Sequence, residues 1–368
     1  MAIIFDKSLP IGNVLHALNN NVIEFHSDYA ELPLNAEITL DGYTTRIIYP
    51  SPNGKFYFNF KDYISNYLNT NNYADSLDFE ISTVFYDWTN NVFTDKEIDV
   101  KINFVDATSE TETINNDWLS SYVQKRYKYY NRDISSNGVY LLQTTDDISR
   151  RVENLYYWSG FPIDFTLLNT TDNEMYINTG FFNLNIPQIT VNRCLLSDGS
   201  SVTDLNQYPL EIRNVVGNAL VYTINIIEET PCDNGYYFKW INSLGGWSYW
   251  HFQHGTEQLK TKELGEIDQN VNDIQNTTSP MVQIGKTAND VINVYTDVLN
   301  ERQSTQLRDL FDSPKIYLFT GIIGSTATFE DWIEVKLTNS NYTTKQAKTT
   351  TNQYNLTFEV PDNDTRKL

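Results

Sequence analysis

The side chains of this chain that could do chemistry are four histidines, two cysteines and several pairs of neighbouring carboxylates. Histidine and cysteine are the usual ligands of zinc, and a nucleophilic enzyme needs a base beside its serine or cysteine. The sequence contains none of the hydrolase, zinc-protease or nucleotide-binding motifs that place such groups together. Cys232, His251 and His254 are the nearest metal-ligand candidates, and their spacing matches no zinc site. We therefore predict no catalytic residue, no metal and no cofactor.

The neighbouring carboxylates raise the alternative of a glycoside hydrolase, in which an acid and a base lie about 5–10 Å apart. Adjacent side chains of a strand point to opposite faces, so acids that are adjacent in the sequence have the wrong geometry. A productive pair assembled from distant strands stays open. We predict that the chain is not an enzyme. The adjacent acids are Asp146–Asp147, Glu228–Glu229 and Glu330–Asp331.

The element with the strongest pattern is the segment 232–252, CDNGYYFKWINSLGGWSYWHF. Aromatic residues alternate along 236–240, turn residues follow at 242–246, and aromatic residues recur along 247–252. This pattern predicts a β-hairpin. The favoured interpretation is that its rings pack a core. The alternative is that Trp240, Trp247 and Trp250 form a platform for a sugar or a peptide.

The composition favours an all-β chain of more than one domain. The 368 residues can bury several cores, and 25 Tyr and 19 Phe are typical of sheets packed with large rings. The net charge of -21 argues against binding to phosphate and so against sequence-specific nucleic-acid recognition. The local basic cluster is interpreted as a solvated face or a subunit contact. It consists of Lys125, Arg126, Lys128 and Arg132.

Cysteine use and the amino-terminal sequence bear on the compartment. Cys194 and Cys232 are too few for a disulfide scaffold, and whether they form one bridge stays open. The start of the chain lacks a basic region followed by an apolar stretch, and no window approaches about 18 consecutive apolar residues. We expect a soluble protein with no membrane partner, made in a cytoplasm.

Strand-like alternation recurs along the chain and predicts a mainly β fold of two or three antiparallel β-sandwich-like domains with a few short helices. Residues 1–107 are predicted to form the first domain. The acidic segment 106–116, which has no periodicity, is the predicted boundary. Residues 117–208 are predicted to form a middle β-rich domain, and 209–368 a C-terminal β-rich domain with the aromatic hairpin and one short helix.

Several local predictions complete this outline. The alternating residues 220–226 lead into the hairpin, so we expect both in one sheet. The spacing predicts one or two helical turns over 61–68 and a helix within 293–313 that stops before Pro314. Helical spacing also begins at Ile267. The polar tract 338–352 predicts a long loop that orders on assembly.

The hairpin resembles a signature, Lys/Leu-Trp-x-Asn-x-x-Gly-Gly-x-x-x-Trp/Tyr-x-Phe, of tail and ring proteins of crAss-like and other Bacteroidetes phages. YPSPNGKFYFNFKDYISNYL near the start, and LRDLFDSPKIYLF followed by DWIEVKLTN near the end, are similar to segments of the same group in the same order. Residues 117–208 have no counterpart in this resemblance. The signature is carried by Lys239, Trp240, Asn242, Gly245, Gly246, Trp250 and Phe252.

The resemblance implies a structural virion protein of a tailed bacteriophage, assembled into a ring or collar of the tail between the portal and the distal tail. Its implied partners are copies of itself and other tail, ring or portal proteins. Its implied location is the virion tail, after synthesis in the host cytoplasm. A ring that forms part of the DNA conduit would have an acidic or neutral inner wall, so that genomic DNA passes with only passive contact. The alternative is a tail-associated glycan-binding module for receptor recognition.

Overall fold

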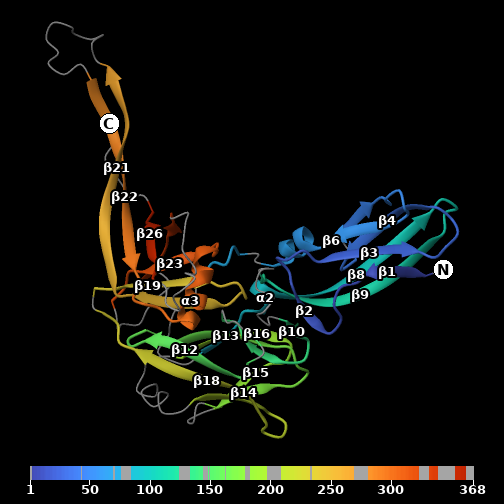
Figure 1. The fold of residues 1–368 in the computed structure, drawn as a ribbon, viewed down its shortest axis with the longest axis horizontal. Coiled ribbons are helices and arrows are strands. Elements are labelled where there is room, and N and C mark those ends of the chain that lie inside the picture. The colour runs from blue at the N-terminus through green and yellow to red at the C-terminus, as the bar shows by residue number, and fades with distance from the viewer. Residues whose placement is uncertain are drawn as a thin grey trace. The chain divides into compact units, whose positions relative to one another are not determined.

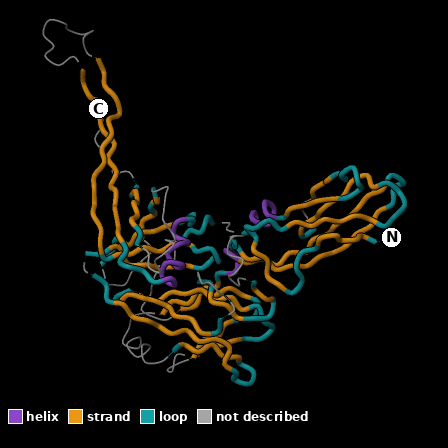
Figure 2. Tube along the Cα trace, in the orientation of Figure 1, coloured by secondary structure: helices purple, strands orange, loops and turns teal. Residues whose placement is uncertain are grey.

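The computed structural model describes residues 2–42, 44–68, 71–75, 84–123, 133–143, 148, 150–161, 163–178, 183–196, 209–232, 234–268, 281–322, 331–338 and 353–361. Strands dominate, joined by turns and a few short helices (Figure 1, Figure 2). The prediction of a mainly β, sandwich-like fold is therefore confirmed. Contacts divide the chain into two compact units. The first contains 1–157, 162–228 and 242–247, and the second contains 158–161, 229–241 and 248–368.

The first unit begins with a sandwich of a three-stranded and a six-stranded sheet. Phe56, Phe58 and Phe60 alternate with polar residues, and this alternation turns their rings into the core beside Phe25 and Trp118. The predicted helical turns over 61–68 are present. The sheets are β1 (Ile3–Lys7), β3 (Val22–Ser27) and β6 (Phe56–Asn59), then β10 (Ile134–Ser135), β2 (Asn13–His16), β9 (Ser109–Leu119), β8 (Phe93–Phe104), β4 (Pro33–Leu40) and β5 (Thr44–Ile48), with the helices α1 (Lys61–Ile64), η1 (Ser65–Tyr67) and α2 (Thr89–Val92).

A second sandwich follows within the same unit, built from a four-stranded and a five-stranded sheet. Its core includes Phe165, Ile212 and Tyr222, all at most 2% exposed. The strands predicted between 139 and 196 are present. The sheets are β11 (Val139–Leu141), β13 (Ile163–Asn169), β16 (Thr190–Leu196) and β7 (Val84–Asp87), then β12 (Val152–Trp158), β18 (Leu220–Glu229), β17 (Leu210–Asn214), β14 (Met175–Asn178) and β15 (Asn183–Ile186).

The second unit contains two four-stranded sheets and a short helix. The rings of Phe238 and Phe358 stack at 4.3 Å between the sheets. The predicted helix is present as α3, where Asn300 and Gln303 form a capping box. The elements are β20 (Trp247–Phe252), β19 (Tyr236–Ile241), β23 (Ile316–Phe319) and β24 (Trp332–Glu334), then β21 (His254–Asp268), β22 (Met281–Tyr295), β26 (Asn355–Glu359) and β25 (Lys336–Leu337), with α3 (Glu301–Arg308) and η3 (Asp309–Phe311).

The segment 106–116, which the sequence predicts as a boundary without periodicity, contains the first part of a regular strand. Residues 109–119 form β9, which pairs with β8 from Asn103↔Ser109 to Phe93↔Leu119. The polar sequence of β9 gives no reason to expect a strand. β9 nevertheless pairs with β8 along its whole length, and this pairing supplies its backbone hydrogen bonds. The three-domain division stays a prediction, because contacts within one chain do not show which segments fold independently.

One further local prediction is wrong. Strand β18 does not share a sheet with the hairpin: it lies between β12 and β17 in the second sandwich, because the turn after Asn214 returns it onto β17. The helical spacing predicted from Ile267 onward concerns residues that lie almost wholly outside the described part of the chain; Ile267 itself belongs to the long strand β21. Its partner β22 pairs with it from His254↔Tyr295 to Asp268↔Met281, which fixes the extended conformation that the sequence leaves open.

Candidate functional site

The aromatic hairpin predicted from the sequence is present as β19 and β20. Trp240 and Trp247 are fully buried, and Trp250 is only 7% exposed. A sugar or peptide platform needs open ring faces, because stacking requires contact with the ligand. The rings of this hairpin are therefore packing residues, in agreement with the favoured interpretation of the sequence. The turn residues 242–247 belong to the first unit, whereas the rest of both strands belongs to the second.

Asn242 organises the hairpin turn. Its side-chain oxygen accepts hydrogen bonds from the backbone N–H of Leu244 at 2.9 Å and of Gly246 at 3.1 Å. Its side-chain nitrogen donates to the carbonyl of Leu142 at 2.9 Å. The turn is buried, and a buried polar group must find partners inside the protein. The side chain of Asn242 satisfies several of these buried polar groups, which is a physical reason for asparagine at this position of the signature.

The two glycines of the turn permit its close approach to other backbone. A Cβ atom on Gly246 would lie 2.1 Å from the carbonyl oxygen of Leu142, so a larger residue does not fit. Gly245 has a φ of +86°, and a Cβ there would lie 3.0 Å from the carbonyl oxygen of Ser120. Glycine alone can adopt the positive φ at 245 and leave room for the nearby carbonyl oxygens at 245 and 246 without strain. The Gly-Gly pair of the signature is thus a packing requirement.

Beside the turn, the first unit buries an ion-pair cluster that sequence reasoning missed. Arg193 on β16 donates to Asp75 at 2.7 Å and to Asp164 on β13 at 2.5–3.0 Å, and all three side chains are fully buried. The guanidinium carbon lies 5.3 Å from the ring centroid of Trp247 and 5.8 Å from that of Trp88. A planar cation that lies beside two indoles and pairs with two carboxylates has favourable electrostatic partners inside the core.

The signature residues of the second unit lie in its aromatic core. Lys239 is fully buried, with its ammonium 4.2 Å from the ring centroid of Trp332 and 5.2 Å from that of Tyr317. The rings of Phe252 and Phe238 meet edge to face at 5.5 Å. The structure therefore divides the seven signature residues into two groups. Asn242, Gly245 and Gly246 shape the turn, and Lys239, Trp240, Trp250 and Phe252 lie in β19 and β20.

His251 adds a pH dependence to this core. Its ring is 3% exposed and packs near the rings of Trp158 and Tyr237. Burial lowers the pKa of His251 from 6.5 to about 4, and the backbone of Cys232 offsets only part of this effect. The imidazole is therefore neutral in the folded chain at neutral pH.

Acidification is expected to destabilise the second unit through His251. The unfolded imidazole gains a proton near its ordinary pKa, whereas the folded one resists until about 4, so stability is lost as the pH falls from about 6.5 to 4. The full shift corresponds to about 3 kcal/mol. Urea unfolding at pH 7 and at pH 4.5 measures it. His251→Phe should remove most of the slope and His254→Gln should keep it, and equal slopes in both variants would contradict this assignment.

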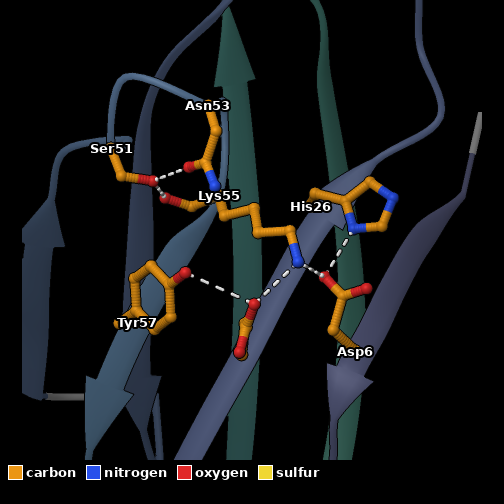
Figure 3. Close-up of polar contacts among 7 residues, drawn as sticks. Asp6, His26, Ser51, Asn53, Lys55 and Tyr57 are labelled. Atoms are coloured by element: carbon orange, nitrogen blue, oxygen red, sulfur yellow. Dashed lines mark hydrogen bonds and ion pairs between the residues drawn. The ribbon is translucent and has the colours of Figure 1, made fainter.

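A polar cluster lies on β1, β3 and the turn before β6 (Figure 3). The ammonium of Lys55 contacts Asp6 at 3.2 Å and Glu24 at 2.7 Å, and His26 contacts Asp6 at 2.9 Å. The hydrogen bond from His26 lowers the pKa of Asp6, and the hydrogen bonds to Glu24 and Asp6 raise the pKa of Lys55. A general acid needs a raised carboxyl pKa, so Asp6 is unsuited to that role. These partly exposed pairs join neighbouring strands and, because water screens them, contribute little to stability.

Several sequence predictions concern residues outside the described part of the chain. These are the basic cluster at 125–132, the acids Asp146, Asp147 and Glu330, and nearly all of the polar tract 338–352. Both cysteines are free thiols, Cys194 buried and Cys232 exposed. In the described segments, no group of three His, Cys, Asp or Glu side chains is placed to hold a metal ion. None of the helices described has the length and apolar character that crossing a membrane requires.

Comparisons with known proteins give weak likenesses. No family model and no curated protein matches the chain. Among solved structures, fibronectin(III)-like modules of Clostridium thermocellum CbhA align over 62% of this chain and 95% of theirs, at 8% identity and a TM-score of 0.20. Three titin domains align over 81% and 93%, at 8% identity and 0.27. A 1.5-MDa bacterial ice-binding adhesin aligns over 80% and 92%, at 11% identity and 0.18. Likenesses at these TM-scores have no bearing on function.

Proposed function

We propose that this chain is a structural protein that works by assembling with other protein chains. The observation that supports this proposal is the burial of the hairpin rings: Trp240, Trp247 and Trp250, the residues best suited to grip a ligand, are at most 7% exposed. Their role is therefore to hold sheets in place. A chain whose most distinctive aromatic residues pack its core fits a scaffold better than a receptor that binds glycans.

More specifically, the chain is a component of a bacteriophage tail, assembled as a ring or collar between the portal and the distal tail. The hairpin signature supports this assignment, together with the two further segments that resemble the same group of tail proteins. The packing of Asn242, Gly245 and Gly246 offers a reason why a scaffold of this kind would need these residue types. In this role the chain is non-enzymatic and binds no cofactor.

Mass measurement tests this function. Purified protein, sedimented over a concentration series, is expected to form a discrete oligomer, and peptides of the chain should be found in washed phage particles. A permanent monomer that is also absent from particles would rule out the virion role. If this monomer instead bound host-surface polysaccharide, the glycan-binding alternative would replace the proposed structural function. Turnover of such a polysaccharide would point to an enzyme.

A further inference from the structure

The two longest strands of the second unit, β21 and β22, form a ladder that is irregular at one level. There Gly265 pairs with Gly285, which we call the glycine pair. Leu264 precedes the first glycine and Ile284 the second, and neither has a partner in the described ladder. An unpaired residue within a ladder is a β-bulge, which bends its strand and weakens the local hydrogen bonding. Each strand therefore has a bulge beside its glycine.

Both glycines adopt a backbone conformation that other residues rarely adopt. The φ angle is +143° at Gly265 and +155° at Gly285. A side chain at positive φ collides with its own backbone, and glycine has no Cβ to collide. A lack of room does not explain Gly265, because an added Cβ would meet the side chain of Ile284 at an ordinary 3.5 Å. The backbone conformation is therefore what requires glycine there.

The two bulges cancel, so the strands keep one register on both sides of the glycine pair. Two residues of β21 and two of β22 lie between the regular stretches of the ladder. A regular ladder is therefore open to the same four residues, with Leu264 opposite Gly285 and Gly265 opposite Ile284. A change from one pairing to the other needs no slip of the neighbouring residues, so the rearrangement is local.

No third strand restrains this level in the described part of the chain. β26 pairs with β22 only along Val291–Tyr295, and Figure 1 shows β21 and β22 running on together beyond it. A two-stranded ribbon has little stability of its own in water, so it resists bending less than a wider sheet. Leu264 is 43% exposed, so burial of its side chain does not fix the bulge.

We infer that the glycine pair is a hinge, at which the outer end of the ribbon changes direction relative to the rest of the second unit. Both strands have glycine freedom at the same level, so they bend together while the neighbouring pairs stay intact. At every other described level at least one strand carries a side chain that restricts φ. Even Gly255, the remaining glycine of these strands, pairs with Val294.

This hinge follows from the backbone of a single chain and so goes beyond the proposed function. In a protein that assembles with others, a hinged ribbon adjusts its direction to the surface that it meets.

Distances between spin labels, measured by pulsed electron paramagnetic resonance, test the hinge in the full-length chain. In a Cys232→Ser background, Gln258→Cys and Ile267→Cys place one label on each side of the glycine pair, and both sites are exposed. This span is about 30 Å in a regular strand. The unaltered glycines should give a broad distribution of distances. Gly265→Val combined with Gly285→Val favours the regular ladder and should make the distribution about half as wide.

A matched variant and a second label pair separate a hinge from the general motion of a ribbon. Lys262→Val combined with Thr287→Val puts the same side chains at a regular pair of the ladder, and it should leave the width unchanged. Labels at Thr256→Cys and Glu263→Cys lie on one side of the glycine pair and should give a narrow distribution. That comparison leaves both glycines in place, so it holds even if valine disrupts the ribbon.

A distribution across the glycine pair as narrow as the one between 256 and 263 would overturn the hinge. Equal widths with glycine and with valine would also overturn it, provided that circular dichroism shows the strands of the variant intact. Neither result bears on whether the chain is found in phage particles, so the proposed function is decided separately.

Discussion

Replacing Arg193 by methionine is expected to destabilise the first unit by about 3–5 kcal/mol. The substitution leaves Asp75 and Asp164 with no cation, and both carboxylates are fully buried. An uncompensated buried charge costs far more than the net value of the ion pair itself, because water can no longer solvate it. Chemical unfolding followed by tryptophan fluorescence measures the loss, since Trp88 and Trp247 lie close to the guanidinium.

A triple variant separates buried charge from lost packing. Arg193→Met combined with Asp75→Asn and Asp164→Asn removes every charge of the cluster at roughly constant volume, and it should recover part of the stability lost in the single variant. Arg193→Lys should fall between the unaltered chain and Arg193→Met, since an ammonium cannot form the paired contacts of a guanidinium. A triple variant as unstable as the single one would show that shape, and not charge, sets the cost.

Replacing Gly246 by alanine is the second change with a large expected effect, a loss of about 3 kcal/mol or more. The new methyl carbon would lie 2.1 Å from the carbonyl oxygen of Leu142, which is backbone and cannot rotate away. The turn must move back, and the hydrogen bond from Asn242 to that same carbonyl is then lost inside the core. Urea unfolding compares this variant with the unaltered chain.

Gly54 provides the matched control for this variant. It lies in a turn at a φ of +79°, and no atom lies within 4 Å of the Cβ that alanine would add. Gly54→Ala therefore carries only the strain of the left-handed backbone, about 1–2 kcal/mol. A Gly246→Ala variant no less stable than Gly54→Ala would contradict the steric explanation, because it would mean that the turn shifts without cost.

Much of the hairpin could be predicted because its signals are local. Alternating rings over 236–240 and 247–252 favour a pleated surface, and Asn and Gly residues between them favour a turn. The same local chemistry predicted α3 and its stop before Pro314. The turn's close contact could not be predicted, because Leu142 lies 100 residues from Asn242 in the sequence. The residues near Leu142 have no pattern that identifies its carbonyl group as the contact of the turn.

The buried cluster was missed for the same reason. Asp75 lies 118 residues from Arg193, and no spacing rule connects the two. The segment 106–116 suggests a boundary because Ile114 is its single large apolar side chain, whereas the pairing of β9 with β8 decides its structure. A strand held by its neighbour's hydrogen bonds needs little apolar character of its own.

The sequence by itself determined what short-range chemistry controls: a ring-rich, mainly β chain, the aromatic hairpin with its Asn-Gly-Gly turn, and an acidic surface. Only the tertiary structure decided which groups meet: the buried cation between two carboxylates, the glycine against a distant carbonyl, and the long ribbon beyond β26. The physical reason is that alternation and turn preference act within a few residues, whereas burial, charge pairing and sheet order depend on contacts between segments a hundred residues apart.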